Sequence, residues 1–92
     1  MALLEEHEIE LRLEEFKSWA YEDKSLVKEF IHKDFSSALG FVIRAGIEAE
    51  KSNHHPDILI HSYNKVIIRI STHSEGGVTG KDFELAYKIE NI

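Results

Sequence analysis

The sequence predicts an α+β domain with the element order α-β-β-α-β-β-α. Three observations support this class: apolar residues recur every three or four positions in three segments, they alternate with polar residues in four shorter segments, and only a few residues separate the two members of each alternating pair. Such short connections favour antiparallel pairing of consecutive strands. The 92 residues are expected to form one domain, residues 1–92, which is small enough to gain stability from self-association.

The first half of the chain is expected to contain a helix, two strands and a longer helix. Apolar residues at helical spacing among acidic residues predict a first helix that ends before Trp19. The segments SWAYED and SLVKEFIHK then alternate as two strands joined around Asp23 and Lys24. A long core helix is expected over residues 34–51, with Asp34 as its N-cap. The expected core positions of this helix are Phe35, Ala38, Leu39, Val42, Ala45, Gly46 and Ala49.

The helix over residues 34–51 carries more apolar surface than a sheet on one side of it would need. Phe41, Ile43 and Ile47 extend this surface beyond a single stripe. Two explanations are open from the sequence: part of the helix contacts another copy of the chain, or the core is thicker than one layer.

The second half of the chain is expected to contain a hairpin followed by a last helix. The segments DILIHS and KVIIRIST are the clearest strands, and Asn64 between them tolerates turn geometry. The better core face of the second strand consists of Val66, Ile68, Ile70 and Thr72, and its opposite face of Ile67, Arg69, Ser71 and His73. Two glycines end this strand. Thr79, with Asp82 three positions later, predicts a capping box that begins the last helix.

Composition excludes several classes of function. A net charge of −6 opposes direct binding to the polyanionic backbone of nucleic acids. The absence of cysteine excludes disulfides, thiolate nucleophiles and zinc-thiolate sites, and it suits a reducing compartment. The segment MALLEEHEIELRLEEF is acidic and has neither a basic flank nor an unbroken apolar run, so neither a signal peptide nor a membrane span is expected. We therefore expect a cytoplasmic protein.

Three of the histidines form the candidate chemical site. His54 and His55 directly follow the long helix, and Pro56 disfavours helical conformation at the residue before it. The adjacent pair is therefore expected on extended backbone with diverging side chains. Hairpin pairing brings the end of the second strand, which carries His73, close to the start of its partner strand. The three imidazoles are expected to converge there.

Other interpretations of these histidines stand beside a catalytic one. A lone histidine near a helix C-terminus is usually a cap or a surface residue. Three neutral imidazoles can also hold zinc, but the chain has no His-x-His or His-x-x-x-His spacing, so no metal site is expected. The segment THSEGG lacks the pattern of a serine hydrolase, and its glycines lack the lysine spacing of a phosphate loop. The other three histidines are expected at surface or packing positions: His7, His32 and His61.

Taken together, these segments resemble the pterin-4a-carbinolamine dehydratases, a family also known in animals as the dimerisation cofactor of a homeodomain transcription factor. The resemblance runs nearly end to end, from Trp19 through KDFSSALGFVIRAGIEAE, NHHPD, YNKV and STH to GGVTGKDFELA, in family order. Its most specific part is a spaced signature that is met by Glu50, His54, His55, Pro56, Tyr63, His73 and Asp82.

The resemblance implies a fold, an assembly and an activity. The fold is a four-stranded antiparallel sheet with three helices on one face, and the assembly is a dimer or a tetramer that involves the helix over residues 34–51. The activity is dehydration of 4a-hydroxytetrahydrobiopterin, the pterin-4a-carbinolamine, to quinonoid dihydropterin. This reaction needs no metal and no organic cofactor, and it implies neither a membrane nor a nucleic acid as a partner.

The resemblance also implies site residues. The expected catalytic residues are His54, His55 and His73, with the first and last as an acid-base pair in either order and the second orienting the substrate or assisting proton transfer. The expected substrate-binding residues are Glu50, Pro56, Asp57 and Thr72. Glu50, one helical turn before His54, is expected to fix the orientation of that ring. The alternative from another class is a non-catalytic module that uses the same long helix to bind a helix of a partner.

Overall fold

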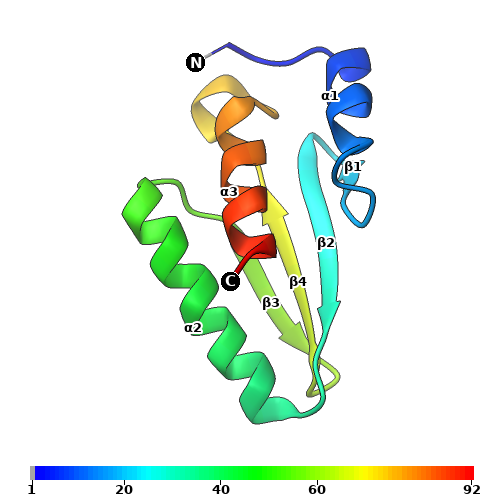
Figure 1. Ribbon diagram of the computed structural model, residues 1–92. Helices are drawn as coiled ribbons and strands as arrows, with labels where there is room; N and C mark the ends of the chain where they lie inside the picture. Colours follow the sequence, from blue (N-terminus) through cyan, green and yellow to red (C-terminus); the bar gives the residue numbers. More distant parts are fainter. Residues whose placement is uncertain (1) are drawn as a thin grey trace.

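The computed structural model describes residues 2–92 and confirms the α+β fold with the predicted order of helices and strands. The elements are α1 (Glu6–Leu13), β1 (Ala20–Glu22), β2 (Ser25–Ile31), α2 (Phe35–Ser52), β3 (Asp57–His61), β4 (Lys65–Ile70), the 3₁₀ helix η1 (His73–Glu75) and α3 (Gly80–Glu90). The strands form one antiparallel sheet in the order β1-β2-β4-β3, and the three α-helices lie over one of its faces (Figure 1). Within residues 2–92, no helix combines the length and the apolar character needed to cross a lipid bilayer.

Strand β4 lies between β2 and β3 and provides the most buried positions of the core. Val66, Ile68 and Ile70 are each 0% exposed, and they face the helices as the alternation of the sequence predicts. The same buried cluster contains residues of all three α-helices and of β2, among them Ile9, Leu26, Phe41, Ala45, Leu85, Ala86 and Ile89. Strand β4 ends at Ile70, two residues before Thr72.

The first hairpin turns at the predicted residues. Asp23 and Lys24 have φ angles of 49° and 63°, and the strand register places Glu22 opposite Ser25. Two consecutive left-handed residues form a turn whose twist matches that of antiparallel strands. The prediction that β1 and β2 are joined at these two residues is confirmed.

The second hairpin turns one residue earlier than predicted. Ser62 and Tyr63 have φ angles of 51° and 58°, whereas Asn64 has a negative φ. The side-chain amide of Asn64 donates instead to the carbonyl of His32 at 2.8 Å, and its own carbonyl accepts the backbone N–H of His32 at 2.8 Å. Asn64 therefore fastens the β3–β4 turn to the end of β2 and does not supply the turn conformation.

Helix α2 begins and ends within one residue of the predicted range 34–51. A carboxylate oxygen of Asp34 accepts the backbone N–H of Ser37 at 2.8 Å, which confirms the predicted N-cap. The hydrogen bonds from Ser37 hold the pKa of Asp34 below its usual value. At the other end, Asn53 adopts a left-handed conformation with a φ of 49°, and this conformation stops the helix.

The buried stripe of α2 differs from the predicted one. Its buried residues are Ala38, Phe41, Ala45 and Ala49. Phe35 and Leu39, which the pattern places in the core, are 50% and 40% exposed. Two apolar stripes lie side by side on this helix, and periodicity alone does not tell which one faces the sheet. Phe41 decides between them, because its ring packs against the rings of Phe30 and His32 at centroid distances of 4.6 and 4.8 Å. The exposed stripe, called the outer stripe below, consists of Phe35, Leu39, Ile43 and Ile47.

The C-terminal end of α3 is fastened to the sheet by a polar contact. The carboxylate of Glu90 accepts the indole N–H of Trp19 at 2.8 Å and the ammonium of Lys28 at 2.7 and 2.8 Å. Burial alone raises the pKa of Glu90, but the hydrogen bonds from Lys28 and Trp19, together with the lysine charge, more than offset this effect. The pKa of Glu90 therefore lies below its usual value.

We predict that Glu90→Gln lowers the free energy of unfolding at neutral pH by about 1 to 2 kcal/mol, the range for a charged hydrogen bond with partial exposure. Because the folded-state pKa of Glu90 is lowered, its stabilisation is fully present above the unfolded-state pKa and is lost as the pH falls through the folded-state pKa. Urea unfolding at a series of pH values measures this difference. Glu84→Gln, at an exposed position of the same helix, serves as the control. A Glu90→Gln difference that stays constant down to acid pH would contradict the prediction.

Candidate active site

The end of α2 places His54 and His55 on extended backbone. The left-handed Asn53 reverses the chain, and the backbone N–H groups of Asn53 and His54 donate to carbonyls of the last helical turn at 3.1 Å each. Pro56 disfavours helical conformation at His55, and the chain enters β3 directly after the proline. The two adjacent imidazoles contact different carboxylates, which confirms the prediction that their side chains diverge.

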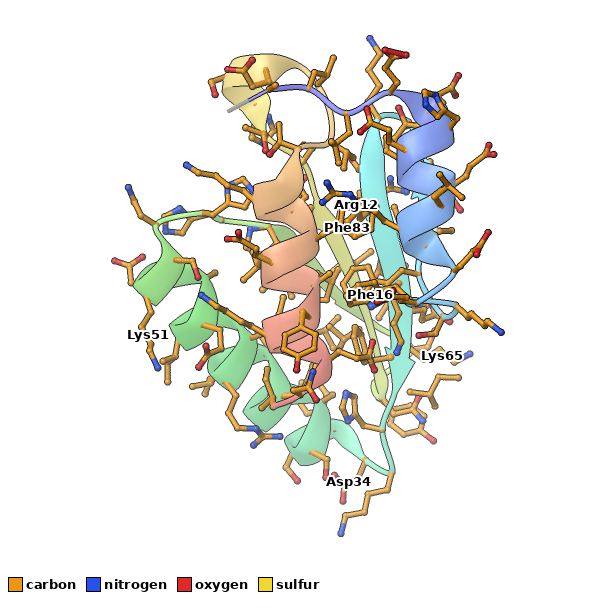
Figure 2. All side chains as sticks on the ribbon, turned by 45° about the horizontal axis from the view of Figure 1, so that its top comes forward. Arg12, Phe16, Asp34, Lys51, Lys65 and Phe83 are labelled. Carbon is orange, nitrogen blue, oxygen red and sulfur yellow. The ribbon has the colours of Figure 1, made fainter. Side chains whose placement is uncertain are left out.

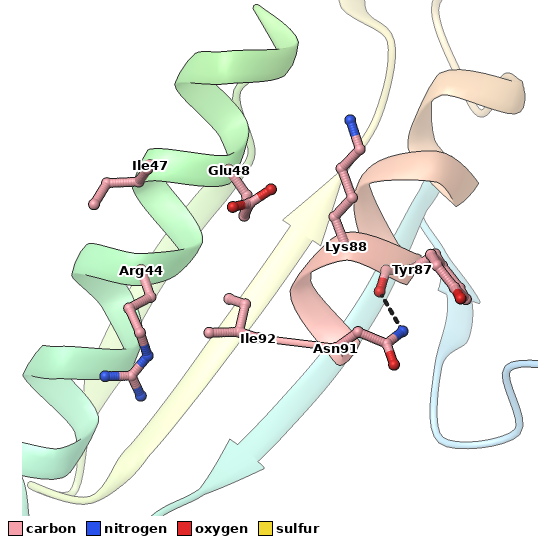
Figure 3. Close-up of a pocket in the computed structure, with 7 residues that line it drawn as sticks. All are labelled: Arg44, Ile47, Glu48, Tyr87, Lys88, Asn91 and Ile92. Atoms are coloured by element: carbon pink, nitrogen blue, oxygen red, sulfur yellow. Dashed lines mark hydrogen bonds between the residues drawn. The ribbon is translucent and has the colours of Figure 1, made fainter.

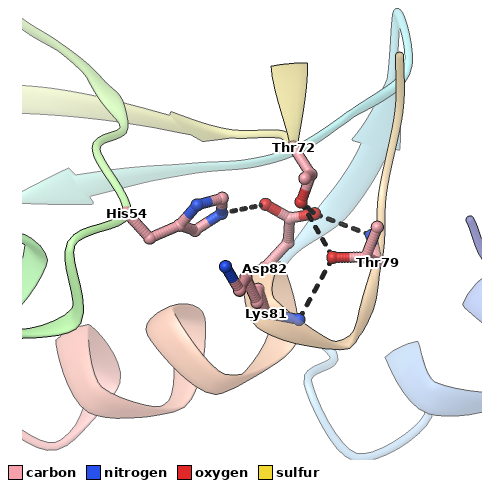
Figure 4. A network of polar contacts seen from close by, with 5 residues as sticks. All are labelled: His54, Thr72, Thr79, Lys81 and Asp82. Atoms are coloured by element: carbon pink, nitrogen blue, oxygen red, sulfur yellow. Dashed lines mark hydrogen bonds and ion pairs between the residues drawn. The ribbon is translucent and has the colours of Figure 1, made fainter. Parts of the chain in front are cut away.

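His54 reaches the N-terminus of α3, where it meets a buried carboxylate. Its Nε2 lies 2.6 Å from Oδ1 of Asp82, whose side chain is 0% exposed, and the side chain of His54 is itself only 12% exposed (Figure 4). The other oxygen, Oδ2, accepts the backbone N–H of Thr79 at 2.7 Å and the hydroxyl of Thr72 at 2.8 Å. These contacts satisfy a carboxylate that has been removed from water. They also fix the orientation of the His54 ring.

The prediction that Glu50 orients His54 is wrong, because α2 ends before the chain reaches His54 and the reversal at Asn53 turns the ring away. Oε1 of Glu50 instead lies 2.7 Å from Nε2 of His55. The side chains of this pair are 80% and 59% exposed, and ion pairs with such exposure hold their partners only weakly. The orienting carboxylate of His54 therefore comes from α3 and not from α2.

His73 is connected to the same carboxylate through its neighbour in the chain. Thr72 is buried, and its hydroxyl contacts both Thr79 and Asp82. His73 follows as the first residue of η1, and it is exposed. Asp82 thus links His54, which follows α2, to the strand end that carries His73 (Figure 4).

The loop between β4 and α3 is held in place by the N-terminal segment. The backbone N–H of Leu4 donates to the carbonyl of Val78 at 2.9 Å. A Cβ atom on Gly77 would lie only 2.9 Å from a methyl carbon of Leu3, so any larger residue here would displace the Leu3 side chain. Gly76, with a φ of 73°, ends η1 in the left-handed conformation. The loop that follows His73 therefore has a defined path to Thr79.

Two of the expected substrate-binding residues lie where the chain enters β3. Pro56 is half-buried, and Asp57 is exposed. Asp57 is paired in register with Arg69, and strand alternation places both on the face of the sheet opposite to the helices. A depression of about 200 Å³ on this face is lined by Asp57, Ile58, Leu59, Ile67 and Arg69. Asp57 therefore lies on the opposite side of the sheet from α3, which carries Asp82.

The remaining histidines occupy surface or packing positions, as predicted. His7 is exposed on α1, and His61 contacts Glu29 across the open face of the sheet at 2.7 Å. His32 packs its ring against Phe41.

Away from the histidines, the helical side of the molecule has several larger hollows, two of which lie between pairs of helices. One of about 360 Å³ lies between α2 and α3 (Figure 3), and its lining residues are Arg44, Ile47, Glu48, Tyr87, Lys88, Asn91 and Ile92. The other, of about 450 Å³, lies between α1 and α3, where Arg12, Phe16 and Phe83 line it (Figure 2). None of the three candidate histidines lines either hollow, so size alone does not identify the site.

Sequence reasoning missed Thr79 and Asp82 as members of the site. The pattern predicts them as a capping box, and the structure confirms that box. Capping uses Oδ2 of Asp82, so Oδ1 remains available for His54. The signal that could have identified Asp82 is its place in the spaced signature after His73. Within residues 2–92, no group of three or more His, Asp or Glu side chains is arranged to hold a metal ion.

Comparisons with known proteins agree with these observations. Residues 2–92 match the family described as Pterin 4 alpha carbinolamine dehydratase. The chain is 48% identical over 89 residues to a protein of Sulfolobus acidocaldarius, with 97% of each chain covered. It is 44% identical over 91 residues to a protein of Roseiflexus castenholzii, with 99% of this chain and 97% of the relative covered. Both relatives are provisionally named pterin-4-alpha-carbinolamine dehydratases.

A solved structure shares the fold as well as the sequence. The transcriptional coactivator/pterin dehydratase from Brucella melitensis aligns with a TM-score of 0.91 and 37% identity, over 98% of this chain and 97% of that one. The similarity therefore extends over nearly the whole of both chains. This chain belongs to the pterin-4-alpha-carbinolamine dehydratase family.

Proposed function

We propose that the chain dehydrates 4a-hydroxytetrahydrobiopterin to quinonoid dihydropterin and so acts in tetrahydropterin recycling. The hydroxyl on C4a takes up a proton and leaves as water, and N5 loses a proton, so the reaction needs a donor and an acceptor that work near neutral pH. Imidazole is the side chain that suits both tasks. The observation that carries the proposal is the contact between His54 and the buried Asp82, which Thr72 links to the strand end before His73.

We assign His54 and His73 as the acid-base pair, in either order. Asp82 holds the ring of His54 in one orientation, and the exposed ring of His73 is accessible to a substrate. His55, with Glu50 as its partner, is assigned to substrate orientation or to an auxiliary proton transfer.

The remaining residues are proposed to shape the site around the pterin. Glu50 and Pro56 lie within or beside the segment that carries the adjacent histidines, where they can contact the substrate. Asp57, whose side chain is on the opposite face of the sheet from Asp82, is proposed to help hold this loop in place. The hydroxyl of Thr72 is occupied by Thr79 and Asp82, so we propose that Thr72 supports the site through these contacts.

The proposed reaction uses neither a metal nor an organic cofactor. The pterin loses water and exchanges no electrons with the protein, so proton transfer is the only chemistry that the protein supplies. The absence of cysteine suits a reducing compartment, and we propose the cytoplasm as the location.

A second candidate function is binding of a partner through α2, and the outer stripe is the observation that favours it. Phe35, Leu39, Ile43 and Ile47 recur every four residues and are 50%, 40%, 64% and 53% exposed. Such a row forms a ridge that can pack into the groove of another helix. We propose that the outer stripe mediates self-association to a dimer or a tetramer. A non-catalytic interaction module would use the same surface.

We predict that His54→Ala and His73→Ala each lower kcat by about 10²-fold or more, because each removes one acid-base group while the other and water remain. The double variant should be at least as impaired as either single variant. His7→Ala, at an exposed position on α1, should keep the parent activity. The assay follows the decay of freshly generated 4a-hydroxytetrahydropterin with chelator-treated protein. A double variant as active as the parent would refute the acid-base assignment.

The same assay separates the two candidate functions. A parent chain that binds a partner but does not accelerate the decay of the substrate, with His54, His55 and His73 intact, would favour the interaction module. Acceleration by the chelator-treated parent supports the cofactor-independent dehydratase.

We predict that Ile43→Glu shifts the chain to a smaller assembly, because it places a charge in the centre of the outer stripe. Light scattering coupled to size-exclusion chromatography measures the mass. Leu11→Glu is the matched control, since Leu11 is 61% exposed on α1 and Ile43 is 64% exposed on α2. Equal masses for the parent, the Ile43→Glu variant and the control would show that the outer stripe is not the interface.

A further inference from the structure

The hydroxyl groups of Thr72 and Thr79 form a directed chain of hydrogen bonds that ends on Asp82 (Figure 4). An ionised carboxylate only accepts hydrogen bonds, so the 2.8 Å contact with Asp82 uses the single hydroxyl proton of Thr72. The 2.8 Å contact between the two threonine hydroxyls must then use the proton of Thr79. The oxygen of Thr79 in turn accepts the backbone N–H of Lys81 at 3.2 Å. Every donor in this chain therefore has an assigned direction.

The same direction extends to His54. Oδ2 of Asp82 receives the hydroxyl of Thr72 and the backbone N–H of Thr79, and Oδ1 lies 2.6 Å from Nε2 of His54. When Asp82 is a carboxylate it has no proton to give, and Nε2 is then the donor. The neutral ring then carries its hydrogen on Nε2, and its lone pair is on Nδ1.

We propose that Thr72 and Thr79 are positioning residues that, through Asp82, hold His54 in the tautomer with hydrogen on Nε2, so that Nδ1 is the atom that exchanges a proton with the pterin. The exchange at Nδ1 rests on the proposed function. The tautomer is a property of the protein alone.

Helix capping alone does not require this arrangement. A capping box needs the contacts between Thr79, Asp82 and the first backbone N–H groups of α3. Thr72 lies ten residues before Asp82, beyond the end of β4, and it still directs its hydroxyl to the carboxylate. Thr72 is 7% exposed, and Thr79 and Asp82 are both 0% exposed, so water does not readily replace a missing hydroxyl. The additional hydrogen bond from Thr72 therefore fixes the orientation of the Asp82 carboxylate, which in turn contacts His54.

The tautomer determines what His54 can do in the reaction. When Nδ1 acts as the base, it takes the proton from N5, and the electron pair of the broken N–H bond forms the double bond between N5 and C4a. The C4a–O bond breaks, and the oxygen leaves as water with a proton from the acid. The ring is then a cation that donates from Nε2 to Asp82, so the positive charge lies next to a carboxylate. When His54 is instead the acid, the ring begins as the cation, Nδ1 gives its proton to the C4a hydroxyl, which leaves as water, and His73 takes the proton from N5.

The test compares the parent with Thr72→Val, which removes the hydroxyl with little change in shape, and Thr72→Ser, which restores a hydroxyl. Two-bond ¹⁵N–¹H correlations of the imidazole rings, recorded where His54 is neutral, show which nitrogen carries the hydrogen. We expect hydrogen on Nε2 in the parent and in Thr72→Ser, and a mixture of tautomers in Thr72→Val. The kcat of Thr72→Val should fall about tenfold, the effect of one hydrogen bond, with a smaller change in KM. Thr72→Ser should recover most of this loss.

Three results would overturn the proposal: hydrogen on Nδ1 of His54 in the parent, an unchanged tautomer in Thr72→Val, or an unchanged kcat in that variant. Thr79 is intact in both variants, so the capping box of α3 remains, and thermal unfolding checks that they fold. The proposal and the proposed function fail in different ways. A parent with hydrogen on Nε2 but no dehydratase activity would support the tautomer and contradict the function. An active parent with hydrogen on Nδ1 would do the reverse.

Discussion

The structure of the site depends on one buried carboxylate. Removing an ionised carboxylate from water costs on the order of several kcal/mol unless hydrogen bonds replace the lost hydration. Asp82 is 0% exposed, and its replacements come from three parts of the chain: the backbone at the start of α3, the hydroxyl of Thr72 after β4, and the ring of His54 after α2. If any one of these parts moves away, the carboxylate loses a donor that water cannot easily replace. The burial of Asp82 therefore couples the positions of all three.

The hydrophobic core places these three parts. Strand β4 is fixed by its three fully buried residues, so the chain reaches Thr72 at a defined point. Helix α2 packs on the core through a buried stripe that is mostly alanine, and the left-handed Asn53 ends the helix. The outer stripe lies on the same helix and points away from the core. A partner bound there would contact the helix that directly precedes His54, so the proposed association and the proposed site would share one helix.

The sequence predicts the elements well because their signals are local. Helical and strand periodicity, the N-cap at Asp34 and the capping box at Thr79 each depend on residues within a few positions, and the structure confirms them. Two of the wrong predictions concern contacts between residues of different elements, which local patterns do not determine. Periodicity leaves open which of two apolar stripes on α2 faces the sheet, and the aromatic contact of Phe41 with Phe30 settles it. Likewise, Glu50 is near His54 in sequence, but the left-handed Asn53 redirects the chain, so the partner comes from α3.

The two adjacent histidines differ in how firmly their rings are held. His54 is 12% exposed and contacts a carboxylate that two other donors hold in place, so its ring has one orientation. His55 is 59% exposed, and its partner Glu50 is 80% exposed on a flexible side chain, so little energy opposes a change of rotamer. A proton transfer requires a donor and an acceptor at a fixed distance, which favours the rigid ring. Entry and release of a substrate require a group that can move aside. The left-handed residue and the proline that flank this pair therefore place a rigid ring and a mobile ring, suited to the two proposed tasks, at adjacent positions in the chain.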